Sequence, residues 1–333
     1  LVLGELTLPL FLKKFKIIPL VSLLLFLSLV LIGTAVSYSH TEISDPAKTI
    51  TIKKGDSLSW VFAQLSVTPA EEILLKIFLY STGAEFIQAG HYDLTSKTWR
   101  EFLIDISIGR IKQYKFKIQE GSNLFELERL IQASNLEFDC PDFSCLDPIL
   151  PFNEGTLMPE TYFYKYNAPA STILVNSQSA FIEFGKSLWH QKTSLNPLNS
   201  LDDAIILASI VEKEAGNDNE KSVIAGVFLH RLSLKMRLQA DPTIIYGLLP
   251  DFNGNITKKN LKDRSNSYNT YQIPGLPPTP ISIVSKSSLE AVILGQPNEY
   301  LYFVARGDGT HYFSRSYAEH QKAVREYQLK DRL

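Results

Sequence analysis

Cysteine and surplus charge of either sign are both scarce in this sequence. Its 333 residues include 2 cysteines, and 33 lysines and arginines nearly balance 35 aspartates and glutamates, for a net charge of −2. So few cysteines exclude a disulfide-stapled framework, and the balanced charge argues against a nucleic-acid-binding surface. The 17 glycines and 17 prolines are too few for a collagen-like or low-complexity chain. What remains is a folded protein long enough for about two domains.

Several catalytic signatures are also missing. The sequence contains no S-x-x-K and no G-x-S-x-G, which excludes serine enzymes of the penicillin-binding and β-lactamase type. It has no H-E-x-x-H among its 6 histidines, so a zinc hydrolase is not expected. His311 and His320 could approach each other across a terminal hairpin and helix, but we interpret them as packing or solvent-facing residues. We therefore expect no metal and no cofactor.

The two cysteines, Cys140 and Cys145, are close together in the sequence. Their C-x4-C spacing lacks the second pair or the histidines that a structural zinc site needs. A disulfide in an oxidising compartment is the other possibility, and it depends on whether their Cα atoms come within bridging distance. The sequence leaves this question open.

A long uncharged segment lies near the N-terminus. Residues Ile17–Val36 form a run of 20 residues without a charge. At about 1.5 Å per residue, a helix of this length spans a hydrocarbon core of about 30 Å. A cleaved signal peptide is the alternative, because Ala35-Val36-Ser37 loosely resembles a processing site. The run exceeds the usual signal-peptide core of about 7–15 residues, which favours a membrane anchor.

The charges around this segment predict its orientation. Lys13, Lys14 and Lys16 precede it, whereas Glu42 and Asp45 follow it. Positive charge is retained on the cytoplasmic side of single-pass helices. We therefore expect residues 1–16 in the cytoplasm, residues 17–36 in the plasma (inner) membrane, and the rest of the chain outside.

A strand-turn-helix motif is predicted twice after this segment. Residues 49–66 alternate as a strand, turn at Gly55-Asp56-Ser57, and continue with apolar residues at helical spacing. Residues 114–131 repeat the order, with a Gly-Ser turn. The first unit resembles a LysM-like peptidoglycan-binding module, and we assign residues 48–135 to a LysM-like and linking α+β subdomain. Any small α+β module with a capped helix is the alternative.

Other periodic segments complete an α+β fold. Helices are predicted near residues 69–82, 98–108 and 171–191, with a short strand starting at Gly90. The C-terminal region reads as a hairpin that turns at Gly307-Asp308-Gly309, followed by a terminal helix. We expect a larger mixed α+β domain over residues 136–333.

One carboxylate is the candidate for chemistry. Residues 202–215, DDAIILASIVEKEA, predict a helix with acidic residues in its first turn. At 100° per residue, Glu214 lies on the apolar stripe, whereas Glu212 lies about 200° away from it. A carboxyl among apolar neighbours has a raised pKa and can act as a general acid. The alternative is a frayed helix end where Glu214 pairs with Lys213 or Lys221.

A loop rich in proline and glycine follows at residues 267–282, SYNTYQIPGLPPTPIS. It presents Tyr268, Asn269 and Tyr271, whose amide and aromatic groups suit sugar recognition. Packing of a proline-rich turn is the competing interpretation.

Several motifs in order resemble one family. These are EGTLMPETYFY, ASIVEKEA, VFLHRL, MRLQADPTIIYG, YNTYQIPGLPPTPIS and YLYFVARGDGTHYFSRSYAEHQKAV. Together they are similar to the MltG (YceG-like) family of endolytic murein transglycosylases, from about residue 48 onward. The resemblance places the catalytic glutamate, the second Glu of E-K-E, at Glu214. Met158 and Glu160 depart from the common Phe and Asp, which leaves the role of Glu160 as a substrate contact open.

The resemblance implies a function and further residues. Such enzymes cut the β-1,4 bond between MurNAc and GlcNAc and leave a 1,6-anhydroMurNAc end, here in nascent strands beside the membrane. Peptidoglycan glycan strands would be the substrate, and a membrane-bound peptidoglycan synthase a plausible partner. A non-catalytic peptidoglycan-binding scaffold is the alternative function. The residues expected to contact substrate are Gln239, Asp241, Tyr268, Asn269, Tyr271 and, with its role open, Glu160.

Overall fold

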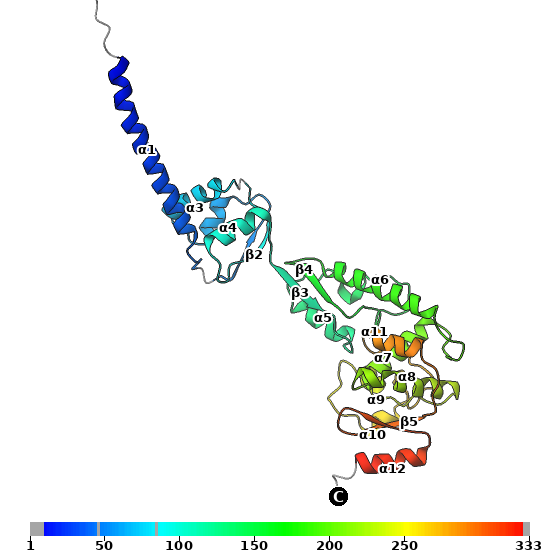
Figure 1. The fold of residues 1–333 in the computed structure, drawn as a ribbon. Coiled ribbons are helices and arrows are strands. Elements are labelled where there is room, and N and C mark those ends of the chain that lie inside the picture. Colours follow the sequence, from blue (N-terminus) through cyan, green and yellow to red (C-terminus); the bar gives the residue numbers. More distant parts are fainter. Residues whose placement is uncertain (1–9, 45–46, 84–85, 329–333) are drawn as a thin grey trace, which may run out of the picture. The chain divides into compact units, whose positions relative to one another are not determined.

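The computed structural model describes residues 10–44, 47–83 and 86–328, which form two compact units (Figure 1). Unit 1 comprises residues 1–114 and unit 2 residues 115–333. The fold mixes helices and short strands, as the α+β prediction requires. Helix α5, which the prediction assigned to the small subdomain, belongs to unit 2.

Unit 1 is a small α+β unit at the end of a long helix. Its β1 and β2 pair antiparallel, with Ile50 opposite Tyr92. Apolar side chains from all of its elements, including Phe62, Phe78 and Phe102, form one core. The elements are α1 (Leu10–Ser39), β1 (Thr49–Ile52), α2 (Leu58–Gln64), α3 (Pro69–Ser81), β2 (Gly90–Asp93) and α4 (Trp99–Ile108).

Helix α1 contains the predicted membrane segment. Its residues Leu20–Ser39 have a mean hydropathy of 2.5 and are long and apolar enough to span a membrane. The side chains from residue 20 to residue 34 are exposed. Ala35 and Ser39 are instead fully buried, because the last turns of α1 pack into the core of unit 1.

Local sequence signals explain where these helices begin. Helix α3 starts with a capping box, in which Thr68 and Glu71 each bind the other's backbone N–H. The two predicted strand-turn-helix motifs are confirmed. The side chains of Ser57 and Asn123 cap α2 and α5, and a glycine with a positive φ precedes each cap. In both cases the turn glycine adopts a left-handed conformation that other residues rarely accept.

Unit 2 carries most of the helices. Strand β3 pairs with β4, and β5 pairs antiparallel with β6 around the predicted glycine turn. Its elements are β3 (Gln113–Lys117, which begins before the division), α5 (Leu124–Gln132), the 3-10 helix η1 (Pro141–Phe143), β4 (Thr161–Lys165), α6 (Ala170–Trp189), α7 (Leu201–Glu214), α8 (Asp218–Ser233), α9 (Asp241–Gly247), α10 (Lys258–Lys262), α11 (Lys286–Ile293), β5 (Tyr302–Ala305), β6 (His311–Ser314) and α12 (Tyr317–Tyr327). The predicted hairpin and terminal helix are confirmed.

Helix α7 is the centre of unit 2. Its residues from Ala204 to Val211 are all buried, against α6, α8, α9 and α11. Ser200 caps the helix by accepting a hydrogen bond from the Asp203 N–H at 3.1 Å. Because the helix is enclosed along its length, the residue at its C-terminal end has a well-defined position.

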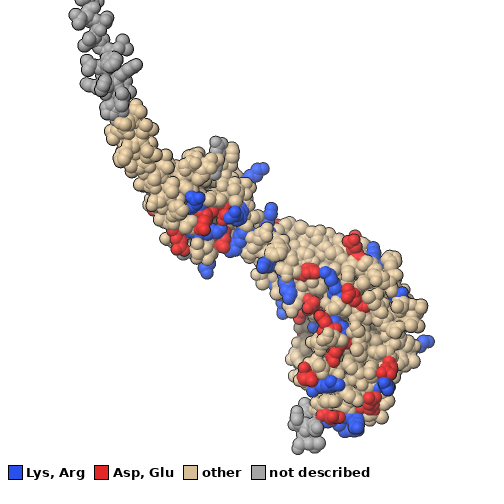
Figure 2. Space-filling view, in the orientation of Figure 1, with Lys and Arg blue, Asp and Glu red and all other residues tan. Residues whose placement is uncertain are grey.

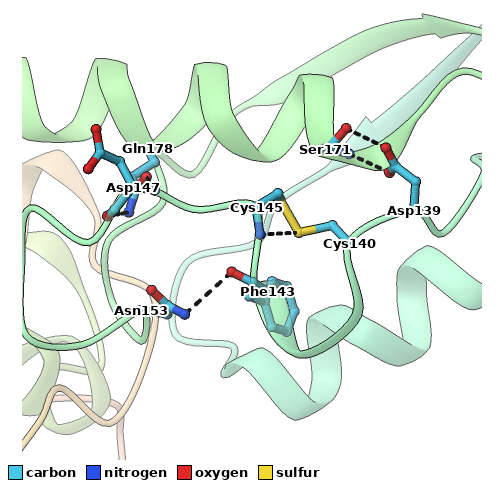
Figure 3. Close-up of a disulfide and its surroundings, with 8 residues drawn as sticks. All are labelled: Asp139, Cys140, Phe143, Cys145, Asp147, Asn153, Ser171 and Gln178. Atoms are coloured by element: carbon cyan, nitrogen blue, oxygen red, sulfur yellow. Dashed lines mark hydrogen bonds between the residues drawn. A yellow bond between two sulfur atoms is a disulfide. The ribbon is translucent and has the colours of Figure 1, made fainter.

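A disulfide closes a small loop between α5 and α6 (Figure 3). Cys140 and Cys145 have Cα atoms 5.5 Å apart, which settles the question that their spacing left open. Beside the loop, Asp139 accepts hydrogen bonds from the backbone N–H and the hydroxyl of Ser171, at 2.9 and 2.5 Å. These hydrogen bonds therefore fasten the residue before the bridge to the first turn of α6.

Charged residues of both signs alternate over the face seen in Figure 2, and no one-sign patch stands out there. Residues 20–39 of α1 contain no charged residue. The distribution agrees with the balanced composition.

Candidate active site

A cavity of about 580 Å³ lies in unit 2 beside the C-terminal end of α7. One wall comes from the end of α7, α8 and the start of α9, and the other from the β5–β6 hairpin and α12. Its lining residues are Glu214, Arg231, Leu238, Gln239, Asp241, Pro242, Ile245, Tyr271, Tyr302, Phe303, Val304, Ala305, His311, Tyr317, His320, Val324 and Gln328.

Close packing brings the hairpin next to the end of α7. The Asn217 amide donates to the Gly309 carbonyl at 3.1 Å. A Cβ atom at Gly216 would lie 2.7 Å from that same carbonyl oxygen, so a larger residue there would push the hairpin away. Glycine two residues after Glu214 therefore allows the two walls of the cavity to meet.

Glu214 is the last residue of α7, and it is partly buried in the cavity lining. Burial of the carboxyl group is the main reason that its pKa rises from 4.5 to about 7. Repulsion from Asp241 raises the pKa further, and attraction to Arg231 opposes both effects. A substantial fraction of Glu214 is thus protonated at neutral pH.

Neither lysine of the alternative interpretation pairs with Glu214. Lys213 donates to the Gly121 carbonyl at 2.9 Å, and Lys221 forms ion pairs with Glu212 and Asp218 at 3.3 and 2.7 Å. Among the described residues, no side chain donates a hydrogen bond to the Glu214 carboxyl. Its proton is therefore available to a molecule that enters the cavity.

Asp241 is the second acid of the cavity. It begins α9, and its Oδ1 atom accepts a hydrogen bond from the Tyr271 hydroxyl at 2.7 Å. The same contact, together with burial, raises the pKa of Tyr271. Tyr271 thereby keeps the Asp241 carboxylate within the electrostatic range of Glu214.

Gln239 reaches the cavity from a strained backbone position. Its φ of 53° lies in the left-handed region, which is uncommon for a residue with a Cβ. Its N–H donates to the Thr270 carbonyl at 3.2 Å, and the Ala240 N–H donates to the Thr270 hydroxyl at 2.9 Å. Backbone strain of this kind is typical of functional sites. Here the two hydrogen bonds to Thr270 hold the Gln239 backbone in its left-handed conformation.

Comparisons with known proteins show the family of this chain. The profile of the YceG-like family matches residues 50–326. The chain belongs to the YceG-like family. An endolytic murein transglycosylase of Bacillus subtilis is 28% identical over 315 residues, which cover 84% of each chain. One from Streptococcus pneumoniae is 30% identical over 179 residues, 52% of this chain and 32% of that protein.

A solved structure is similar as well. The crystal structure of a YceG-like protein from Listeria monocytogenes matches with a TM-score of 0.54 and 29% sequence identity. The match covers 82% of this chain and 97% of that one. The family expectation that arose from the motifs is therefore confirmed.

Three residues expected to position substrate line the cavity of this YceG-like protein, namely Gln239, Asp241 and Tyr271. The other three lie outside its lining. Asn269 is fully buried, and its amide donates to the Asp263 and Asn260 carbonyls at 2.8 and 3.0 Å, so it holds the loop together. The Tyr268 hydroxyl is hydrogen-bonded to that of Thr279 at 2.7 Å.

Glu160, the remaining expected contact, is exposed and forms an ion pair with Lys286 at 2.7 Å. Exposed ion pairs of this kind contribute little to stability. The structure thus gives Glu160 a surface partner instead of a place beside Glu214.

Glu212 has a structural environment, as expected of the carboxylate on the other face of α7. Only 7% of its side chain is exposed. Its Oε2 atom accepts hydrogen bonds from the Ser285 N–H and the Ser288 hydroxyl at 3.1 and 2.6 Å, beside the ion pair with Lys221. Glu212 therefore joins α7 to α11 and does not line the cavity.

Sequence reasoning missed the basic and imidazole groups of the site. Both His311 and His320 line the cavity, a location that the sequence did not indicate. The His311 Nδ1 atom is 2.8 Å from Glu220, and His320 stacks on Tyr302 at 5.2 Å. Arg231 is buried and donates to the Leu301 and Leu238 carbonyls.

Glu154 was missed too, although its motif was noticed. It is 4% exposed, and burial raises its pKa to about 7. Its Oε2 atom accepts from the Leu124 N–H and the Tyr246 hydroxyl, at 3.1 and 3.0 Å. Glu154 thus joins the start of α5 to α9, the helix that carries Asp241.

Within the described ranges, no group of three or more His, Cys, Asp or Glu side chains is placed to hold a metal ion.

Proposed function

We propose that this protein is a membrane-anchored endolytic lytic transglycosylase of peptidoglycan. It would cut MurNAc–GlcNAc β-1,4 bonds in nascent glycan strands and leave a 1,6-anhydroMurNAc end, which releases strands or terminates their elongation. Family membership and the names of its relatives support the activity. The observation that carries the proposal is Glu214, a carboxyl with a pKa of about 7 that lines a cavity without a lysine partner.

One carboxyl group is sufficient for this reaction. Protonated Glu214 gives its proton to the glycosidic oxygen as the bond to C1 of MurNAc breaks. The resulting carboxylate takes the proton of the C6 hydroxyl, whose oxygen forms a new bond to the same C1. No water is consumed, and Glu214 ends the cycle protonated.

The neighbours of Glu214 support both halves of this cycle. Burial and the Asp241 charge disfavour the carboxylate form, so the group recovers its proton readily. Arg231 limits this effect, which keeps the carboxylate accessible during the reaction. We assign substrate positioning to Gln239, Asp241 and Tyr271.

Asp241 also suggests a second candidate function. An ordinary glycosidase uses two carboxylates, the second as a nucleophile or as the base that activates water. Asp241 lines the same cavity as Glu214 and could take that part. Hydrolysis would then leave a reducing MurNAc end instead of an anhydro end.

The experiment that tests the proposal is mass spectrometry of products from uncrosslinked glycan strands, with wild-type protein and Glu214→Gln. Anhydro ends from the wild type alone support it. Reducing ends would show a hydrolase, and strand binding without turnover by both proteins would show a non-catalytic scaffold. Normal anhydro yield from Glu214→Gln would reject the assignment of the catalytic residue.

We further propose that α1 anchors the protein in the plasma membrane with residues 1–16 in the cytoplasm. Its apolar span and the three preceding lysines support this orientation. Cleavage near Ala35 would cut a helix whose end is buried in the core of unit 1, which argues against a signal peptide. The disulfide suits the oxidising side of the membrane.

The remaining assignments concern binding partners and domains. We propose that residues 48–135 form a LysM-like subdomain that contacts peptidoglycan, supported by the strand-helix-helix-strand order around the antiparallel β1–β2 pair. Residues 136–333 would be the catalytic domain. A membrane-bound peptidoglycan synthase is the partner that we expect, since the anchor would keep the site near newly made strands.

A further inference from the structure

Helix α3 runs back along α1. It packs against the C-terminal part of α1, beside which it lies in Figure 1. Glu71, in the first turn of α3, lies close to Tyr38, in the last turn of α1, because both line one small cavity of unit 1. Two packed helices that meet in this way are antiparallel. The C-terminal end of α3 therefore points toward the N-terminal end of α1.

The length of α3 brings its end beside the apolar span. Tyr80 follows Glu71 by nine residues, which is a rise of about 13 Å along the helix. Measured back from Tyr38, the same rise reaches the level of residue 29. If residues 17–36 cross the bilayer, this level lies seven residues, or about 10 Å, inside the outer end of the span, which is the depth that interfacial apolar side chains reach.

The side chains of α3 change character along the same direction. The charged residues Glu71, Glu72 and Lys76 lie within the first eight residues of α3, whereas residues 77–83 carry no charge. Ile73 is 57% exposed and Tyr80 67% exposed, and seven residues of separation place them on one face. Phe86, which follows the helix, is 77% exposed. The apolar residues thus gather toward the membrane side of unit 1.

We propose that Ile73, Tyr80 and Phe86 insert into the interfacial region of the bilayer, as a second membrane contact beside α1. Tyrosine is enriched at this depth because its ring is apolar and its hydroxyl reaches water. The proposed occupant is lipid, since the face is continuous with the exposed apolar surface of α1. The contact rests on the proposed membrane span, and it fixes how unit 1 faces the bilayer.

Site-specific fluorescence tests this contact in the full-length chain. Both natural cysteines are in the disulfide, so one introduced cysteine is the only free thiol. The variants are Tyr80→Cys, Phe86→Cys and, as a matched control, Thr95→Cys. Thr95 is exposed and follows Leu94, whose N–H donates to the Lys48 carbonyl beyond the end of α1. A fourth variant, Phe26→Cys, places the probe within the apolar segment of α1 and tests whether that segment lies in the bilayer.

Each variant carries an environment-sensitive fluorophore and is reconstituted in vesicles of phosphatidylcholine and phosphatidylglycerol. Nitroxide-labelled lipid is then added as a quencher. We expect the probes at 80 and 86 to be quenched several-fold more than the probe at 95, and the probe at 26 to be quenched as well. Unfolding is not a concern, because the side chains at 80, 86 and 95 are exposed.

The outcomes separate this contact from the membrane span. Quenching at 26 with no difference between 80, 86 and 95 overturns the contact and leaves the anchor standing. A probe at 80 that is shielded from aqueous iodide but not quenched by lipid would show that protein covers the face, which also overturns it. If the probe at 26 is not quenched, the span and the contact are both refuted.

Discussion

Asp241→Asn tests how Glu214 keeps its proton. The pKa of Glu214 is raised from 4.5 to about 7, first by burial and second by the Asp241 charge, while Arg231 lowers it. Without the Asp241 charge, burial is the one remaining effect that raises the pKa of Glu214, and the Arg231 charge still lowers it. The pKa of Glu214 should therefore fall from about 7 toward 4.5.

The consequence is a loss of the active acid at high pH. Each unit by which the pKa falls lowers the protonated fraction at pH 8 about tenfold, or about 1.4 kcal/mol. The general acid must be protonated before the bond breaks, so the alkaline limb of the activity profile moves to lower pH. At pH values well below the new pKa the loss disappears, apart from any pH-independent effect on substrate positioning.

The assay is the initial rate of anhydro-end formation from pH 4.5 to 9, with each protein normalised to its own maximum. Normalisation separates the shift from a change in substrate positioning. Glu160→Gln is the matched control, because it also converts a carboxylate to an amide but lies outside the cavity lining. An alkaline limb that stays in place in Asp241→Asn, or that moves equally in Glu160→Gln, would refute the reasoning.

Three further predictions follow from the same contacts. Glu214→Gln should unfold at higher urea concentration than wild type at pH 8 but not at pH 4. The reason is that the raised pKa of the Glu214 carboxyl lowers the stability of the wild-type native state by up to roughly 3 kcal/mol as the pH rises from 4.5 to about 7. Equal urea midpoints of the two proteins at pH 8 would contradict this. Glu212→Gln should destabilise the protein by roughly 3 kcal/mol by breaking the buried pair with Lys221, yet the folded fraction should still form anhydro ends. Replacing Cys140 and Cys145 by serine should cost about 2 kcal/mol through loop-closure entropy, measured by urea unfolding against the oxidised protein.

Local sequence signals predicted the elements better than their assembly. Periodicity and capping residues such as Ser57 and Asn123 act within a few positions of the helix they start, so helix positions were readable. Helical geometry also placed Glu214 apart from Glu212, and of these two only Glu214 lines the cavity.

Long-range packing explains what the sequence did not reveal. His311 lies on the hairpin whose turn packs against Gly216, almost one hundred residues earlier, and His320 lies on the helix that follows the hairpin. Asn269 was expected on a loop surface, but its side-chain amide is buried and donates hydrogen bonds to the backbone carbonyls of Asn260 and Asp263, in and just after α10. The buried carboxyl of Glu154 depends on partners in α5 and α9, which lie far from it in sequence.

The placement of the β5–β6 hairpin and α12 has a consequence for biosynthesis. Ribosomes make Glu214 more than eighty residues before they reach Tyr302, so the acid exists well before the opposite wall of its chamber. A nascent chain halted between these points would carry the proton donor without an enclosed place for substrate. The complete cavity is thereby formed only after translation has passed the terminal helix.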